Sequence, residues 1–200
     1  MNKYPYKIGE YEDCQNYNGG VFFVKKVLIN ALLIVSFIII YLLQVNLFSW
    51  FKIAGVMPNL FVIFILFIGL FFSRGLGIAY SVIFGFLLDL FIGKKIGISA
   101  VMFGFVGLIG GIFDKNFSKE SRMTIIIMVM VTTCVYELGS YILGYFINGY
   151  SFEILQFIKL LLIEILYNGM ITIIFYPLMQ NLGYKIEEEY KGNKILTRYF

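Results

Sequence analysis

Three acidic residues, Asp89, Glu137 and Glu164, lie within otherwise apolar stretches of this 200-residue chain. A carboxylate at the centre of a helix in lipid costs about 2.5–3.5 kcal/mol, so in a membrane each would need a structural or functional reason. Three interpretations are open for Glu137 and Glu164: hydrogen bonding to polar side chains of neighbouring helices, a substrate or proton site, and an acceptor for a partner's helix. Asp89 lies shortly before Lys94 and Lys95, near the end of its apolar stretch.

The usual catalytic motifs are absent from the sequence. Histidine does not occur, which excludes His-based acid–base catalysis and most transition-metal sites. There is no phosphate-binding loop, no dinucleotide fingerprint and no nucleophile elbow. Cys14 lies in a polar tail and Cys134 in an apolar run, a placement that indicates neither a disulfide framework nor a metal cluster. We therefore expect no enzyme activity, no cofactor and no metal.

Composition places these acids in a membrane protein. Hydrophobic residues make up 60% of the chain and charged residues 14%, whereas a soluble domain has roughly 45–50% apolar and about 25% charged residues. The first 26 residues are polar and rich in tyrosine, and they lack the basic start and cleavage signal of a secretory peptide. The first apolar run is therefore expected to remain as an anchor.

The apolar runs predict about six transmembrane helices, because about 20 apolar residues cross roughly 30 Å of hydrocarbon. The region 75–113 is divided by Gly93, Lys94 and Lys95 into two segments of marginal length. We interpret them as two short spans, with a pair of re-entrant segments as the alternative. The predicted fold class is an all-α integral membrane protein, a polytopic helical bundle. The other four spans are residues 27–48, 54–73 (with Pro58 in the first turn), 123–147 and 154–180.

Basic residues are distributed unevenly between the two sides that six spans define. Twelve lie on the side of both termini and four on the opposite side. The positive-inside rule therefore predicts that the N- and C-termini are cytoplasmic. The predicted domains are a polar cytoplasmic N-terminal tail (residues 1–26), a six-helix transmembrane domain (27–182) and a cytoplasmic C-terminal tail (183–200).

Spacing along the last two spans predicts a shared depth for two of the acids. Glu137 lies about ten residues before the outer end of its span, and Glu164 about ten residues after the outer start of the next. Ten residues of helix measure roughly 15 Å, so both should lie near the middle of the membrane. Glu164, Asn168 and Thr172 repeat every four residues and form a polar stripe. We expect Glu164 and Asn168 to organise the interior of the bundle.

Small residues recur every four positions in the third predicted span and beyond it. This spacing keeps them near one helix face, and in lipid such a face lets helix backbones approach closely. Helix packing is therefore the favoured interpretation, with a partner helix or a ligand path as the alternative. The residues in this series are Gly77, Ser81, Gly85, Asp89, Gly93 and Gly97.

Several of these motifs together resemble the rod shape-determining protein family MreD. The resemblance runs from about residue 28 to residue 182 and rests on the order and spacing of short motifs around the six spans. The longest is the series of Gly85, Asp89, Gly93 and Gly97. The other motifs are Pro58-Asn59-Leu60, Arg74-Gly75, and Asn168 followed by Pro177-Leu178. The Tyr-rich N-terminal 26 residues are longer than the family pattern implies.

This resemblance implies a non-enzymatic component of the bacterial elongation machinery, the Rod complex, which maintains rod shape by organising lateral peptidoglycan synthesis. The implied partners are MreC above all, then RodA, a class B penicillin-binding protein and MreB, together with membrane lipid and without nucleic acid. Fold similarity of the family to the substrate-binding subunits of energy-coupling-factor vitamin transporters implies an alternative function as such a subunit. The family positions implied to serve folding and partner docking are Pro58, Arg74, Gly85, Asp89, Gly93, Gly97, Asn168 and Pro177.

A docking mechanism follows as a hypothesis. The bundle would clamp a partner's single membrane helix, with Asp89, Lys94 and Lys95 at the outer rim. The basic residues Lys115, Lys119 and Arg122 of a predicted cytoplasmic loop would lie against anionic lipid, where each contributes about 1 kcal/mol. A cytoskeletal partner is the alternative.

Overall fold

The computed structural model describes residues 8–92, 97–117, 119, 121–148 and 153–191, with side-chain surroundings given from Val24 to Tyr190. Its contacts divide the chain into two units, Met1–Ser36 and Phe37–Phe200. The described part of the first unit is helical throughout and starts at Ile8, inside the segment expected as a polar tail. The predicted fold class is confirmed: the described residues form six α-helices and no strand.

The helices follow the predicted apolar runs. Five of them are long and apolar enough to cross a membrane, including the two marginal segments, which are continuous helices of 19 residues each. This supports two short spans over a re-entrant pair. The elements are α1 (Ile8–Leu42), a π-helical turn η1 (Leu43–Leu47), α2 (Leu60–Phe71), α3 (Arg74–Ile92), α4 (Ile98–Asn116), α5 (Arg122–Asn148) and α6 (Ile154–Lys191).

The second predicted span is shorter than expected. Its helix, α2, has 12 residues and measures about 18 Å, well short of a full crossing. Ala54 and Gly55 have positive φ angles of 51° and 84°, which form a turn where helix was expected. Pro58 therefore precedes the helix, and Asn59 is its N-cap. Apolarity alone does not show where a helix begins, and here the backbone at residues 54–59 decides it.

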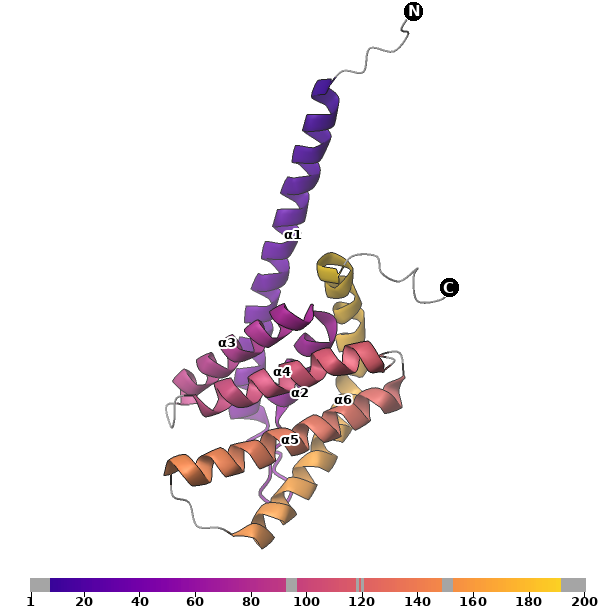
Figure 1. The fold of residues 1–200 in the computed structure, drawn as a ribbon. Coiled ribbons are helices and arrows are strands. Elements are labelled where there is room, and N and C mark those ends of the chain that lie inside the picture. The colour runs from indigo at the N-terminus through magenta and orange to yellow at the C-terminus, as the bar shows by residue number, and fades with distance from the viewer. Residues whose placement is uncertain (1–7, 93–96, 118, 120, 149–152, 192–200) are drawn as a thin grey trace, which may run out of the picture. The chain divides into compact units, whose positions relative to one another are not determined.

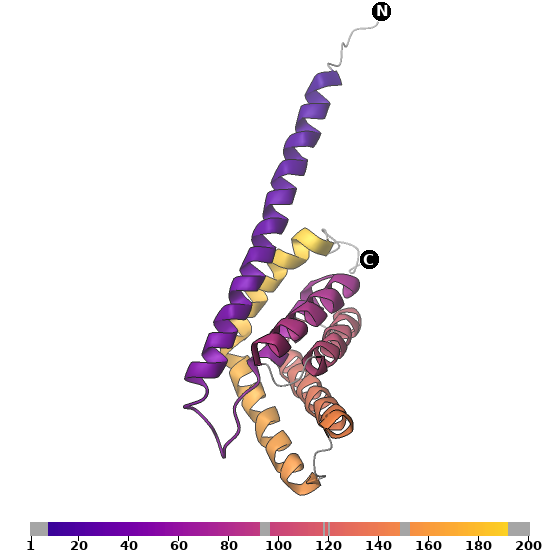
Figure 2. The same ribbon diagram turned by 90° about the vertical axis from the view of Figure 1, so that its left-hand side faces the viewer.

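α2 is the core of the second unit, and all 12 of its residues are buried. It contacts α3, α4, α5 and α6. Figure 1 shows α3, α4 and α5 lying side by side, and Figure 2 shows α6 running along one side of this layer. Phe37, at the start of the unit, packs against Phe61 of α2 and Phe84 of α3, with ring centroids 5.3 and 4.9 Å away. A helix surrounded in this way must be apolar on every side.

Close packing of small residues joins α2, α3 and α4, as the four-residue spacing predicted. A Cβ added at Gly85 would lie 2.5 Å from the Ser99 carbonyl oxygen, which shows how closely α3 approaches the start of α4. A Cβ at Gly69 of α2 would lie 2.7 Å from the Gly107 oxygen of α4. Gly97 differs, since its φ of +110° rather than a close neighbour requires glycine there. Gly93 lies outside the described residues.

Candidate functional site: the polar ends of a buried helix

Polar side chains gather at both ends of α2. At its N-terminal end the Asn59 side chain accepts a hydrogen bond from the Val62 amide, at 3.3 Å, as an N-cap does. The Asn59 backbone N–H donates to the side-chain oxygen of Asn168, in α6, at 2.7 Å. The Asn168 side-chain NH₂ in turn donates to the Thr133 hydroxyl, in α5, at 3.0 Å. Asn168 is fully buried. One amide side chain thus ties the start of α2 to both of the last two helices.

The two acids of the last spans meet at this same end of α2. The side chains of Glu137 and Glu164 lie next to each other and next to Asn59. The structure therefore brings together the two residues that spacing placed at one depth. An ionised carboxylate can only accept hydrogen bonds, so two neighbouring carboxyl groups can bond to each other only when one of them carries a proton. A remaining negative charge would be favoured by the partial positive charge of the helix N-terminus.

Two residues that the sequence did not single out hold the chain leading into α2. Gln44 donates to the Pro58 carbonyl oxygen at 2.6 Å and accepts from the Leu60 amide at 3.2 Å. Tyr167 of α6 donates its hydroxyl hydrogen to the Phe51 carbonyl oxygen at 2.7 Å. Both are polar residues within apolar runs, which is the signal that could have identified them.

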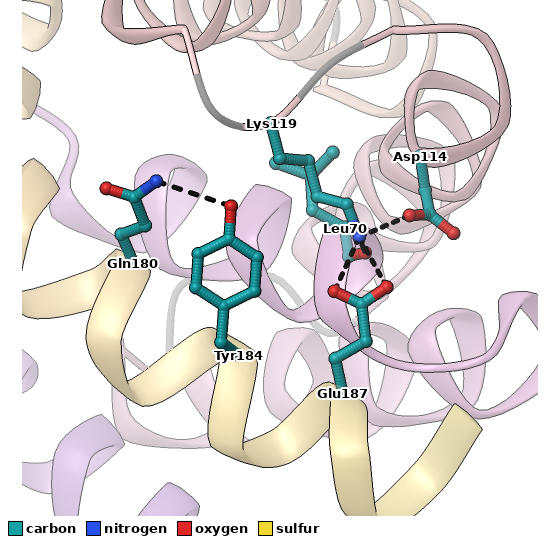
Figure 3. Close-up of polar contacts among 6 residues, drawn as sticks. All are labelled: Leu70, Asp114, Lys119, Gln180, Tyr184 and Glu187. Atoms are coloured by element: carbon teal, nitrogen blue, oxygen red, sulfur yellow. Dashed lines mark hydrogen bonds and ion pairs between the residues drawn. The ribbon is translucent and has the colours of Figure 1, made fainter. Parts of the chain in front are cut away.

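A lysine side chain binds the C-terminal end of α2. The Lys119 ammonium group donates to the Leu70 carbonyl oxygen at 3.2 Å and to both carboxylate oxygens of Glu187, at 2.7 and 2.9 Å. It also forms an ion pair with Asp114, and it lies 5.0 Å from the centre of the Phe71 ring. Figure 3 shows the two carboxylates on either side of this ammonium group. A cation at the end of a helix complements its dipole and its unpaired carbonyl groups.

The position of Lys119 corrects one expectation. A lysine lying against anionic lipid would be exposed, whereas only 8% of the Lys119 surface is accessible. Its partners come from α4, from the end of α2 and from the last turns of α6, up to 68 residues away. One turn earlier on α6, the Gln180 side chain donates a hydrogen bond to the Tyr184 hydroxyl at 3.3 Å (Figure 3). The loop lysine is thus part of the interior.

Asp89 caps a helix. It is 4% exposed, and its carboxylate accepts hydrogen bonds from the Gly97 amide at 2.8 Å and from the Ser99 and Ala100 amides at 3.3 Å. It therefore satisfies the unpaired amides at the start of α4 from the end of α3. Lys94 and Lys95, its expected companions, lie outside the described residues. A carboxylate engaged by three amides favours a role in folding for Asp89.

Of the remaining candidates, Arg74 and Pro177 lie apart from these networks, whereas Pro58 belongs to one of them. Arg74 is exposed at the start of α3, where its Cγ would lie 3.2 Å from a Cβ added at Gly111. Pro58 contributes the carbonyl that Gln44 binds, and Pro177 is an exposed residue inside α6. In the part of the chain that the structure describes, no three His, Cys, Asp or Glu residues are placed to hold a metal ion. The described polar groups are arranged to hold helix ends.

Fold and site together define a multi-pass helical membrane protein whose buried polar residues fix helices to one another. The family model described as rod shape-determining protein MreD matches residues 25–186. The chain belongs to this family, which confirms the resemblance of the motifs. It is a family of structural membrane proteins that act in cell-shape determination and are not known as enzymes. Neither a curated protein nor a solved structure matches the chain.

Proposed function

We propose that this chain is a non-enzymatic scaffold of the bacterial elongation complex, and that it maintains rod shape by organising lateral peptidoglycan synthesis together with MreC. The match of the shape-determining family over residues 25–186 carries this proposal. RodA, a class B penicillin-binding protein and MreB would join the same complex. The chain would supply a fixed surface for its partners rather than chemistry.

The packing of the second unit supports a scaffold function. α2 is closed by hydrogen bonds at its N-terminal end and by the Lys119 ion pairs at its C-terminal end. Gly69 and Gly85 bring α2, α3 and α4 within backbone contact. A surface held by such contacts is preorganised, so a partner's membrane helix would bind it without a large loss of conformational entropy.

A cytoplasmic location of both termini completes the proposal. Lys119, in the connection between α4 and α5, contacts Leu70 at the end of α2 and Glu187 in the last turns of α6. These are three of the chain positions that six crossings assign to the basic side of the membrane. Their mutual contact supports that topology, with the short α2 and the turn before it completing one crossing together. The positive-inside rule then assigns this side to the cytoplasm.

Co-purification of the full chain from gently solubilised membranes tests the proposal. A tagged copy is expected to retain MreC and a class B penicillin-binding protein after crosslinking within the cell. Recovery of an ATPase module in place of these proteins would contradict the scaffold and indicate a transporter subunit. Gly85→Leu serves as a control for misfolding, because the added side chain would meet the α4 backbone. Its recovery of partners should fall in proportion to the fraction of the variant that is folded.

One observation favours the transporter alternative as a second candidate. The paired carboxyl groups of Glu137 and Glu164 lie with Asn59 at the N-terminus of a half-length helix inside the bundle. Broken or short helices that end inside a membrane are a common way to build substrate sites in transporters. Native mass spectrometry of the purified chain distinguishes the two functions. A bound vitamin-sized solute that is lost with Glu164→Gln would favour transport.

A further inference from the structure

The turn between η1 and α2 exposes aromatic residues. Within residues 49–54, here called the aromatic turn, Trp50 is 88% exposed, Phe51 61% and Ile53 49%. Lys52 is exposed between them. Trp50 is the single tryptophan of the chain. A short segment with this much exposed apolar surface indicates contact with something other than water.

Hydrogen bonds fix the aromatic turn. The Trp50 amide donates to the Leu47 carbonyl oxygen at 3.1 Å, and residues Ile53 and Val56 exchange two backbone hydrogen bonds of 3.0 and 2.9 Å. The Tyr167 hydroxyl holds the Phe51 carbonyl oxygen from α6. The turn therefore has a defined conformation, in which the aromatic side chains are exposed while several backbone groups are hydrogen-bonded to the protein.

Two physical requirements limit where such a turn can lie. Irregular backbone facing lipid is not tolerated in the hydrocarbon, and an exposed lysine is costly there as well. Bulk water is equally unsuitable for Trp50, Phe51 and Ile53, because transfer of their apolar surface out of water is favourable. The boundary between headgroups and acyl chains satisfies both requirements, and tryptophan is enriched at that depth. The preceding apolar segment Val24–Leu47 is long enough to cross the membrane and ends directly before the turn.

We propose that the aromatic turn is an interfacial anchor that binds the lipid bilayer itself. Trp50 and Phe51 lie at the level of the first acyl carbons, and the Lys52 ammonium group reaches the lipid phosphates. Through the Tyr167–Phe51 hydrogen bond and the Gln44–Pro58 hydrogen bond, the anchor fixes the depth at which α2 begins. The polar network at Asn59 is thereby held at a set distance from the membrane surface.

Fluorescence of Trp50 in nanodiscs of phosphatidylcholine and phosphatidylglycerol tests this, with the unmodified full chain and no added probe. The expected emission is blue-shifted relative to the same protein in denaturant and is poorly quenched by iodide. Lipids brominated close to the headgroup are expected to quench it more strongly than lipids brominated near the chain end.

A relocated tryptophan calibrates the depth scale. In the double variant Trp50→Phe and Phe105→Trp, the indole moves to an exposed position in the middle of α4, and quenching by the chain-end bromines should dominate. Emission from Trp50 that resembles free tryptophan and is strongly quenched by iodide would overturn the proposal, since the turn would then lie in water, open to a protein partner. Strongest quenching of Trp50 by the chain-end bromines would overturn it as well.

Discussion

The two ends of α2 are held by different chemistry. At the N-terminal end, the fully buried Asn168 links Asn59 to Thr133, and the half-buried carboxyl groups of Glu137 and Glu164 lie beside Asn59. At the C-terminal end, a lysine is paired with Glu187 and Asp114, whose side chains are 23% and 20% exposed. Both arrangements complement the helix dipole, with acceptors and acids at the start and a cation at the end.

This difference follows from the surroundings of each end. Around the fully buried Asn168, an ion pair would have to offset a large desolvation cost, so hydrogen-bonded neutral groups are the better solution there. At the partly exposed end, solvation of the carboxylates lowers that cost, and an ion pair becomes favourable. The buried end should therefore be sensitive to the loss of single hydrogen bonds, and the exposed end to charge and salt.

Replacing Asn168 with leucine should have the largest effect. The substitution leaves the Asn59 amide and the Thr133 hydroxyl without a partner, and each unsatisfied buried group costs about 1–3 kcal/mol. We expect a loss of about 2–4 kcal/mol in the free energy of unfolding, measured in detergent by thermal or denaturant unfolding. Asn181→Leu, at an exposed position of the same helix, is the matched control. Equal effects of the two variants would contradict the role of Asn168.

Replacing Lys119 with methionine should have the next largest effect. It removes one donor to the Leu70 carbonyl oxygen and the ammonium group that pairs with both Glu187 and Asp114. The expected loss is about 1–3 kcal/mol, between the values for exposed and fully buried pairs. Lys185→Met, at an exposed position of α6, should change the unfolding temperature little. A stable Lys119→Met variant would show that the end of α2 needs no cation.

A salt titration tests whether the C-terminal end of α2 depends on charge, and its expected effect is smaller. Glu187→Gln keeps a hydrogen-bond acceptor for Lys119 and removes one charge, so we expect a loss of about 0.5–1 kcal/mol. Salt screens partly exposed charges, so high salt should destabilise the unmodified protein more than this variant, which keeps only the Lys119–Asp114 pair. Unfolding temperatures at low and high salt measure the difference. The same salt response in both proteins would mean that the pair contributes nothing.

Glu164→Gln should have the smallest effect, below about 0.5 kcal/mol, because a glutamine amide can both donate and accept at the Glu137 carboxyl. Folding, measured by size-exclusion chromatography, and partner recovery, measured by co-purification, should both be retained. A large loss of folded protein would show that the carboxyl group itself is required at the start of α2.

Sequence patterns predicted the elements better than their ends. Apolar runs located all six helices, and the four-residue spacing of Gly77 and Gly85 predicted the close packing of α3. The predicted length of α2 was wrong, because Ala54 and Gly55 adopt positive φ angles and hydrophobicity does not encode backbone angles. Local turn geometry, rather than composition, makes that helix begin later than predicted.

Part of the site could be predicted from the depth of residues along their spans, whereas the rest depends on tertiary contacts. Counting residues from the span ends placed Glu137 and Glu164 at one level, and the structure joins them. Lys119 was assigned to lipid because its loop is basic, whereas its principal partner lies 68 residues away on α6. Contacts over such separations leave no periodic signal in a single sequence.

Cell width during depletion tests the central claim most directly. The chain is depleted in its host bacterium while a plasmid copy supplies either the unmodified protein or Asn168→Leu, with membrane levels checked by immunoblot. We predict that depleted cells widen and become round, that the unmodified copy restores rods, and that Asn168→Leu restores them poorly. Depleted cells that keep their normal width and rod shape would contradict the assignment of this chain to shape determination.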